Sequence, residues 1–296
     1  MQFIRDIYAT ARAAKRPVIS FEFFPTKTDE GERILLEKTI PALMQLEPDF
    51  CSVTYGAGGS TRDKTLTIVD RIQRQHGLAA MAHLTCVNAT AEETRAYLNE
   101  ARSRGIKNVL ALRGDPPGGG EFNKTEGGFE FSFQLVEFIR QAGGFCIGVA
   151  GFPEGHIACK EGKYVDWERL RKKIDHGAEF VLSQLFFDNA DFFQFWEHLT
   201  GKLGATVPIC PGIIPIMSGS QIKRFTTMCG ARLPKPVLAR LEELGEDDQA
   251  VTEFGIDYAS RQCEELLRAG VPGIHFYTLN KAYATGRIIK NLGLAP

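Results

Sequence analysis

The sequence lacks the segments that mark membrane and secreted proteins. No apolar stretch in its 296 residues approaches the roughly 18 residues of a membrane span, and residues 1–20 lack the apolar core of a signal peptide. Neither sign of charge is in excess, because 35 Lys and Arg stand against 36 Asp and Glu. The charges are scattered, which argues against a nucleic-acid or membrane surface. We therefore expect a cytoplasmic protein that binds a small molecule.

Metal and dinucleotide motifs are also missing. The seven cysteines are odd in number and contain no C-x-x-C pair, so we expect no metal or iron–sulfur site. The sequence has neither a G-x-G-x-x-G motif nor P-loop spacing, which excludes the usual Rossmann and P-loop signatures. Any dinucleotide must then be held by other loops.

The sequence does contain a regular alternation of strand-like and helix-like segments. Such alternation predicts parallel strands joined by crossover helices, and eight units favour one (β/α)₈ TIM barrel over residues 1–296. We expect extra helices between residues 214 and 272, before the last strand. A two-domain, doubly wound protein is the alternative fold. The strand-like runs, rich in β-branched and aromatic residues, are 18–24, 50–54, 79–86, 108–112, 145–150, 180–187, 207–213 and 273–279.

Polar residues recur where these strands end. In a (β/α)₈ barrel the carboxyl ends of the strands form the active-site face, so we expect these side chains to converge at one mouth. They are Glu22, Thr54, His83, Arg113, Asp115, His156, Gln184 and Lys281.

Glu22 lies within the run "SFEFFP". Strand alternation places Ser20, Glu22 and Phe24 on one face and Phe21 and Phe23 on the other, so Glu22 is expected to point into the barrel near its mouth. A structural ion pair is one interpretation. The other is that phenylalanine-rich surroundings raise the pKa of Glu22 and make it a general acid.

Other polar residues allow two interpretations each. Arg113 and Asp115 in "ALRGDPPGGG" are either a surface pair or two charges aimed into the mouth. His83 and His156 are packed core residues or site residues. Asp166 and Lys173, seven residues apart on a predicted helix, share a face that is either solvated or functional. Gln184, in an apolar run, needs a hydrogen-bond partner from a ligand or from neighbouring backbone.

The sequence resembles the bacterial catalytic type of methylenetetrahydrofolate reductase. The matching segments follow the family's order along nearly the whole chain: "SFEFFP", "SVTYGAGG", "HLTC", "ALRGD", "PEGH", "QLFFD", "PGI-x-P" and "HFYTLN". The resemblance implies a barrel that carries FAD and reduces 5,10-methylenetetrahydrofolate to 5-methyltetrahydrofolate by ping-pong kinetics, feeding methionine synthesis. It implies NADH, or else NADPH, as the reductant, and a homo-oligomer.

The resemblance also implies residue roles. Glu22 would donate the proton that opens the methylene bridge, and Asp115 would lie between flavin and folate. Gln184, Gln221 and Phe225 would grip the folate or the nicotinamide, and Lys281 would hold the folate glutamate tail where relatives commonly have Arg. Phe131 and Phe152 stand where some relatives have tyrosines against the flavin. The other positions that match FAD contacts are Thr54, His83, Arg113, Gly114, Asp115, His156, Asp166 and Lys173.

Two departures and two alternatives remain. The 116–130 loop is longer than in compact relatives, and no C-terminal regulatory domain follows, so inhibition by S-adenosylmethionine is not expected. A flavin-free barrel aldolase or synthase using Lys281 or a carboxylate would be colourless. A folate- or flavin-binding module without turnover would hold flavin that neither nicotinamide nucleotide reduces.

Overall fold

A sheet of nine parallel strands curls into a nearly closed barrel, as the alternation of segments predicts. The computed structural model describes residues 1–56, 62–116, 120 and 122–295, and the structural statements below concern these residues. Neighbouring strands pair in the order β7-β6-β5-β4-β3-β2-β1-β9-β8. The strands are β1 Val18–Phe23, β2 Phe50–Val53, β3 Ala79–Thr85, β4 Asn108–Leu112, β5 Cys146–Gly151, β6 Phe180–Ser183, β7 Ile209–Cys210, β8 Gly212–Ile213 and β9 Gly273–Tyr277.

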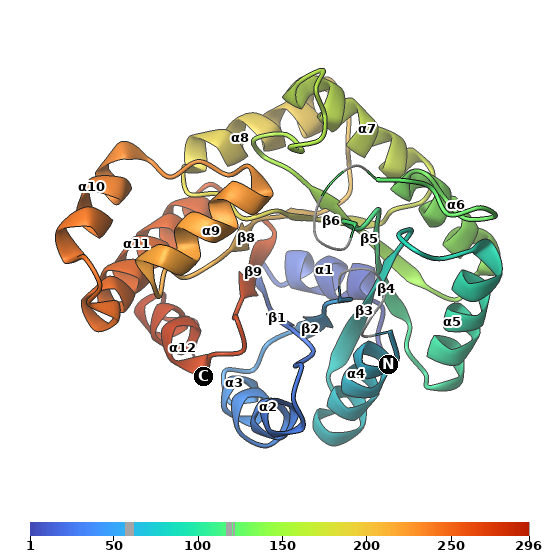
Figure 1. Ribbon diagram of the computed structural model, residues 1–296, viewed down its shortest axis with the longest axis horizontal. Helices are drawn as coiled ribbons and strands as arrows, with labels where there is room; N and C mark the ends of the chain where they lie inside the picture. Colours follow the sequence, from blue (N-terminus) through green and yellow to red (C-terminus); the bar gives the residue numbers. More distant parts are fainter. Residues whose placement is uncertain (57–61, 117–119, 121, 296) are drawn as a thin grey trace.

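Helices surround this barrel and connect its strands (Figure 1). None in the described part of the chain is long and apolar enough to cross a membrane. The α-helices are α1 Ile4–Ala13, α2 Asp29–Ile34, α3 Ile40–Met44, α4 Arg62–His76, α5 Ala91–Ser103, α6 Ser132–Ala142, α7 Lys163–Asp175, α8 Asn189–Glu197, α9 Gly219–Cys229, α10 Lys235–Leu244, α11 Asp248–Arg268 and α12 Ala282–Asn291; π-helical turns η1 Leu35–Thr39 and η3 His198–Lys202 follow α2 and α8.

The seventh expected strand, 207–213, is divided in two. Pro211 separates β7 from β8, because proline has no backbone N–H to donate to a ladder. β7 pairs with β6, whereas β8 pairs with β9. The Gly212 N–H donates to Ser183 Oγ at 2.9 Å, which ties the two sides of this seam together. The barrel therefore has nine strands where eight were expected.

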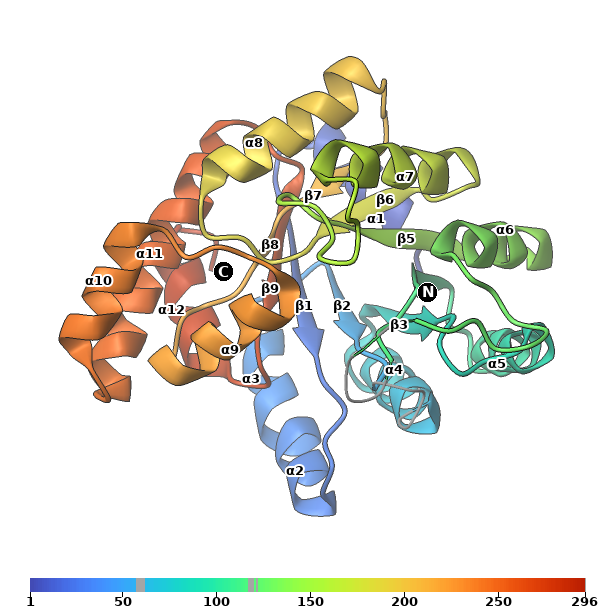
Figure 2. The ribbon, with the colours of Figure 1, turned by 45° about the horizontal axis from the view of Figure 1, so that its top comes forward.

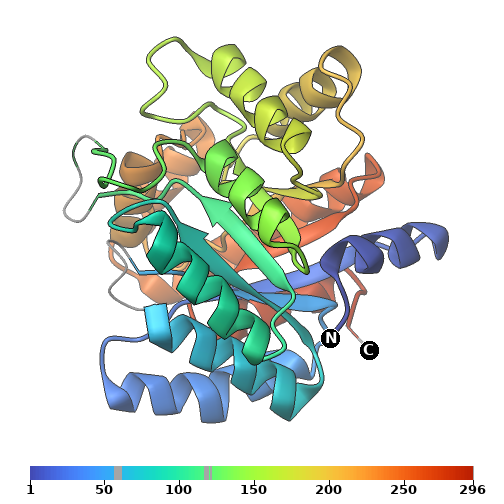
Figure 3. The same ribbon diagram turned by 90° about the vertical axis from the view of Figure 1, so that its right-hand side faces the viewer.

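Helix α1 closes the amino-terminal end of the barrel. Its apolar residues Ile4, Ile7, Tyr8 and Ala11 join one buried cluster with interior side chains of the strands, such as Phe180. Tyr8 and Phe180 lie 5.9 Å apart between ring centroids. Figure 3 shows α1 at one end of the barrel, with both chain termini near it. The opposite end, where the strands finish, remains open to ligands.

Helices α9, α10 and α11 form an additional group on one side of the barrel (Figures 1 and 2). Their apolar residues Ile222, Val237 and Val251 pack in a separate cluster with Leu185 and Ile214, which follow β6 and β8. The expected extra helices before the last strand are thus confirmed. They build one wall beside the open end.

Candidate functional site

A cavity of about 650 Å³ opens at the carboxyl ends of the strands. This volume lies within the range of small-molecule sites. Most of the residues singled out in the sequence line it: Glu22, Thr54, His83, Arg113, Gly114, Asp115, Phe131, Phe152, His156, Asp166, Lys173, Gln184 and Phe225. The expected convergence of strand-end polar residues at one mouth is therefore confirmed for all of them except Lys281.

Glu22 lies in a buried polar cluster at the end of β1. Its Oε2 accepts a hydrogen bond from Ser52 Oγ at 3.0 Å and lies 3.4 Å from His275 Nε2. His83 Nε2 is 3.2 Å from the same oxygen, but it is not aligned for a hydrogen bond. Ser20 Oγ lies 2.8 Å from His275 Nδ1 and so orients that ring. One carboxylate therefore faces two imidazoles in a largely buried position at the wall of the cavity.

The expectation that Glu22 has a raised pKa is wrong. Burial acts to raise the pKa of Glu22, but the two imidazoles outweigh it and hold that pKa below its ordinary value. Strand alternation explains the error. Phe21 and Phe23 belong to the cluster between the strands and the outer helices, so they point away from the carboxylate.

The end of β1 is fastened to the segment after β9. Thr278 Oγ1 donates to the Glu22 carbonyl at 2.7 Å. The Asn280 side chain accepts from Phe24 N at 2.9 Å and donates to Phe24 O at 2.8 Å. Asn280 has φ of +55°, a conformation that asparagine tolerates better than most residues. These bonds fix the backbone at Glu22 and immediately after it.

Arg113, Gly114 and Asp115 follow β4 and form one edge of the cavity. The Arg113 carbonyl accepts hydrogen bonds from the backbone of Cys86 and Val87, which anchors this turn to the end of β3. Gly114 has φ of +80°, and a Cβ there would lie 2.8 Å from Thr85 Cβ. Glycine is therefore required by both backbone conformation and space. The guanidinium of Arg113 lies over the Phe122 ring at 5.2 Å.

Helix α7 contributes Asp166 and Lys173 to the cavity wall, so the predicted shared face is a site face. Lys173 Nζ donates to the Ala150 carbonyl at 3.2 Å. Burial lowers the pKa of Lys173, with Asp166 opposing that shift and Arg113 adding to it. Burial raises the pKa of Asp166, whereas Lys173 and His156 act to lower it. The half-buried Lys173 amine therefore interacts electrostatically with both the Asp166 carboxyl group and the Arg113 guanidinium.

His156 connects this charged wall to an aromatic one. Its backbone N–H donates to Asp166 Oδ2 at 3.2 Å. Its ring lies 4.5 Å from the Phe152 ring in an edge-on arrangement. Burial lowers the pKa of His156, and Arg113 acts in the same direction. Phe131 stacks on Phe133 at 5.8 Å, so aromatic packing without phenolic hydroxyls lines this side.

The proposed folate-side residues separate into two groups. Gln184 follows β6, and its side-chain Oε1 accepts a hydrogen bond from the Leu185 backbone N–H at 2.9 Å. The expected hydrogen-bond partner of Gln184 is therefore neighbouring backbone. Gln184 and Phe225 line the cavity, whereas Gln221 and Lys281 are absent from its lining. Lys281 is exposed at the start of α12. In the 116–130 loop, residues 117–119 and 121 lie outside the described residues.

Sequence reasoning missed several residues that the fold brings to the site. His275 and Ser20 belong to paired strands, and Ser52 lies opposite Glu22 on β2. The signals in the sequence were the histidine within the apolar run "GIHFYT" and the placement of Ser20 on the same strand face as Glu22. Arg169 and Lys172 also line the cavity from α7; Lys172 Nζ lies over the Phe133 ring at 3.7 Å.

Comparison with known proteins agrees with this geometry. The family model described as methylenetetrahydrofolate reductase matches residues 7–293. Methylenetetrahydrofolate reductase (NADH) 1 of Arabidopsis thaliana is 41% identical over 286 residues, which cover 93% of this chain and 48% of that protein. The chain thus spans about half the length of the plant relatives it matches.

A bacterial relative and a solved structure complete the comparison. A protein from Clostridium thermocellum, solved with two copies of 5-methyl-5,6,7,8-tetrahydrofolic acid, shares the fold with a TM-score of 0.63 at 13% identity, covering 97% of this chain and 98% of that one. The 5,10-methylenetetrahydrofolate reductase of Escherichia coli is 37% identical over 279 residues, covering 94% of this chain and 91% of that enzyme. The chain belongs to the methylenetetrahydrofolate reductase family.

Proposed function

We propose that this protein reduces 5,10-methylenetetrahydrofolate to 5-methyltetrahydrofolate, with FAD as cofactor and NADH as reductant. Family membership supports the reaction. The observation that carries the proposal is the buried Glu22 cluster, which shares one cavity with the cations Arg113 and Lys173. Such a cavity offers a proton source and an anion-binding wall within one site.

The residues present fit FAD. Lys173 is half-buried with a single backbone hydrogen bond, and Arg113 has no ion pair among the described residues. These two cations suit a pyrophosphate. Gly114 leaves room for close approach of a ligand to the backbone, and Phe152 and Phe131 offer apolar surface to a ring system. When bound, flavin would supply the hydride transfer that no side chain can perform.

The Glu22 cluster has the groups needed to deliver a proton to the folate. Opening the methylene bridge requires a proton on a bridge nitrogen, and a carboxyl group is a suitable donor. Because the imidazoles hold the pKa of Glu22 below its ordinary value, the carboxyl group must take up a proton in the substrate complex before it can donate one. His275 and His83, whose nitrogens lie within 3.4 Å of Glu22 Oε2, are the neighbouring groups through which that proton could pass.

Other residues of the cavity have roles in binding and charge stabilisation. A negative charge on Asp115 would stabilise the cationic iminium form of the folate. Gln184 and Phe225 would hold the ring systems of the two substrates in turn, which accounts for the expected ping-pong pattern. Gln221 and Lys281 lie off the cavity wall, so we assign them only to parts of the folate that extend beyond it.

The flavin-free aldolase alternative requires a reactive lysine. Lys281, the lysine considered for it, does not line the cavity. Lys173 does, but it is hydrogen-bonded to Ala150 and faces Asp166. The geometry therefore favours an anion-binding role for Lys173 over nucleophilic attack.

Steady-state kinetics test the proposal. FAD-loaded protein is assayed for 5-methyltetrahydrofolate while NADH and methylenetetrahydrofolate are varied together, and NADPH replaces NADH in a parallel series. We expect product formation with parallel double-reciprocal lines. A protein that binds no FAD, or that forms no methyltetrahydrofolate with either nucleotide, would overturn the proposal.

A further inference from the structure

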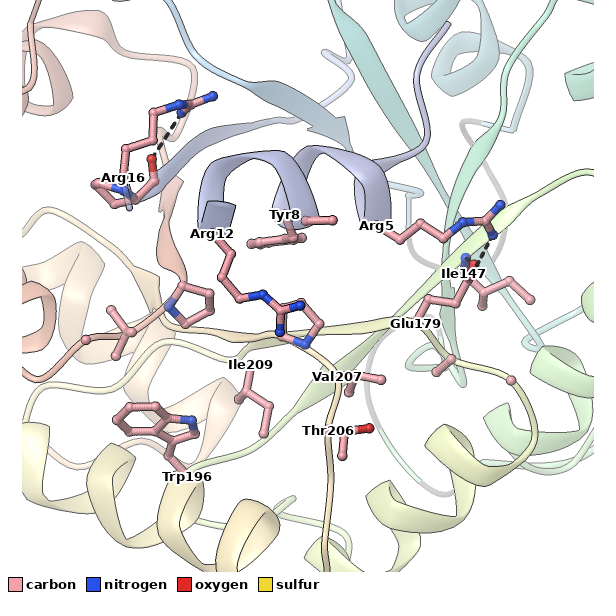
Figure 4. A pocket seen from close by; sticks show the side chains of 18 of the residues that line it. Arg5, Tyr8, Arg12, Arg16, Ile147, Glu179, Trp196, Thr206, Val207 and Ile209 are labelled. Atoms are coloured by element: carbon pink, nitrogen blue, oxygen red, sulfur yellow. Dashed lines mark hydrogen bonds and ion pairs between the residues drawn. The ribbon is translucent and has the colours of Figure 1, made fainter. Parts of the chain in front are cut away.

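A second hollow lies at the amino-terminal end of the barrel, away from the catalytic cavity. Its volume is about 1200 Å³. One wall is α1, and Trp196 of α8 and the segment Thr206–Ile209 form the other side (Figure 4). We call this hollow the basal groove; its remaining walls come from Arg140, residues 143–145, Ile147, residues 177–179 and 270–272, Leu267 and Leu294.

The basal groove concentrates positive charge in a chain whose net charge is −1. Arg5 is neutralised by Glu179 at 2.5 Å, and Arg16 by Asp49 at 2.7 Å. Across the part of the chain that the structure describes, Arg12 and Lys15 have no ion pair or side-chain hydrogen bond. These two exposed cations of the groove therefore lack a counter-charge among the residues that the structure describes.

The end of α1 does not account for these free cations. Basic residues often bind the exposed carbonyls of a last helical turn. Here backbone N–H groups satisfy those carbonyls, because Ala14 N donates to Thr10 O and Arg16 N to Ala11 O. The Arg12 side chain instead extends from α1 into the hollow, toward the segment that contains Val207 and Ile209 (Figure 4).

A third cation, Arg140, is held at the rim of the groove by local backbone. Its guanidinium reaches the His176 carbonyl at 3.4 Å, a weak contact that leaves its other N–H groups free among the described residues. Gly177, with φ of +126°, makes this arrangement possible. A Cβ at that position would lie 2.6 Å from Arg140 Cδ. The absence of a side chain therefore lets Arg140 lie along the rim.

The opposite wall is apolar and contains a flat ring. Trp196 is half-buried, and it lies across the hollow from α1 beside Val207 and Ile209. Its indole N–H has no hydrogen-bond acceptor among the described residues. Pro208 and Pro272 extend the apolar surface. A planar ring can stack here while an attached anionic chain reaches the cations.

We propose that the basal groove is a second ligand site, for an organic anion that carries a planar ring and several negative charges. A nucleoside triphosphate has this chemistry. Its phosphates would contact Arg12, Lys15 and Arg140, and its base would lie on Trp196. The site is separate from the catalytic cavity and does not depend on the function proposed for that cavity.

Calorimetric titration of the FAD-loaded protein with ATP tests this site. Inorganic tripolyphosphate tests binding of the charged part of ATP alone, and adenosine tests binding of its planar part alone. We expect ATP to bind more tightly than either, with an affinity that falls as salt rises. Arg12→Gln should weaken ATP at least about tenfold, because it removes a charge-assisted contact. Arg74→Gln is the matched control, since Arg74 also lies in a last helical turn but not in the groove.

Two results would overturn the proposal. One is the absence of ATP binding at millimolar concentration. The other is ATP binding that Arg12→Gln leaves unchanged, which would place the nucleotide elsewhere, such as in the catalytic cavity.

Tryptophan fluorescence gives a second readout. The chain has two tryptophans, and Trp167 is fully buried whereas Trp196 faces the groove. We expect ATP to change the emission of the wild type but not that of Trp196→Phe. An equal change in both proteins would contradict stacking on Trp196.

Discussion

At the scale of single residues, Glu22 shows why the side-chain environment must be assigned face by face. The alternation of "SFEFFP" correctly predicts that Glu22 points inward, away from Phe21 and Phe23. The same alternation removes the phenylalanines from its surroundings. Neighbouring strands provide Ser52, His83 and His275 instead. The chemistry of the carboxyl group therefore depends on residues that lie far away in the sequence.

The first prediction concerns the Glu22 carboxyl group as proton donor. In Glu22→Gln the amide can still contact Ser52 and His275, but it cannot deliver a proton. We expect FAD content and reduction by NADH to stay near wild type, and folate reduction to fall at least about 100-fold. Stopped-flow absorbance separates these two half-reactions. Folate reduction at the wild-type rate would refute the proton-donor role.

The second prediction concerns stability at acid pH. Because the pKa of Glu22 is lower in the folded chain than in the unfolded chain, its contribution is present above the ordinary value of 4.5 and is lost as pH falls below it. Glu22→Gln cannot titrate. Between about pH 5 and about pH 3 its melting temperature should therefore fall less steeply than that of the wild type.

Calorimetry across this pH range provides the measurement. Glu92→Gln, at an exposed position on α5, is the control and should keep the wild-type slope. Equal slopes for Glu22→Gln and the wild type would mean that the Glu22 cluster does not contribute to acid sensitivity.

At the scale of elements, the strands hold the Glu22 cluster, and the turns after the strands position the rest of the site. The turn after β4 bonds to the end of β3 through the Arg113 carbonyl. The segment after β9 holds the end of β1 through Thr278 and Asn280. Each turn thus fixes side chains of two neighbouring strands relative to each other.

The third prediction tests the turn after β4. In Gly114→Ala, a Cβ would meet Thr85 at 2.8 Å and Val87 at 2.9 Å in addition to the strain of φ +80°. We expect a loss of about 1–3 kcal/mol in the free energy of unfolding and weaker FAD retention. Chemical denaturation and flavin absorbance measure the two effects.

Gly127→Ala is a control that separates the steric clash of a Cβ with its neighbours from the strain of a positive φ. Gly127 has a similar φ of +70°, but a Cβ there would meet nothing within 4 Å. It should lose less stability than Gly114→Ala and should retain FAD. If both variants lost FAD equally, space at Gly114 would not matter for the cofactor site.

At the scale of the whole molecule, periodic patterns predicted the barrel and most of the cavity wall. Residues that follow a strand or share a helix face, such as Asp166 and Lys173, are placed by local periodicity alone. The pairing of Glu22 with His275 joins residues far apart in the chain, and only the closure of β1 against β9 brings them together. The division of the expected seventh strand at Pro211 has the same cause, because β7 pairs with β6 and β8 pairs with β9 only once the sheet has curled into a barrel.

The basal groove also could not be predicted from the sequence, because its walls come from segments that lie far apart in the chain. Its walls come from α1, α8 and several connections between strands. Arg12, Lys15 and Arg16 are close in the sequence, but Arg140 and Trp196 come from distant segments, so the sequence alone does not show that they share one groove. Only the docking of α1 under the barrel brings Arg12 opposite Trp196 (Figure 4).

The most direct test of the account follows the flavin absorbance under anaerobic conditions. FAD-loaded protein is mixed with NADH, and methylenetetrahydrofolate is added after the nucleotide has reacted. We expect the absorbance to bleach with NADH and to recover on addition of the folate, as the shared cavity requires. A flavin that NADH does not bleach, or that the folate does not reoxidise, would contradict the account.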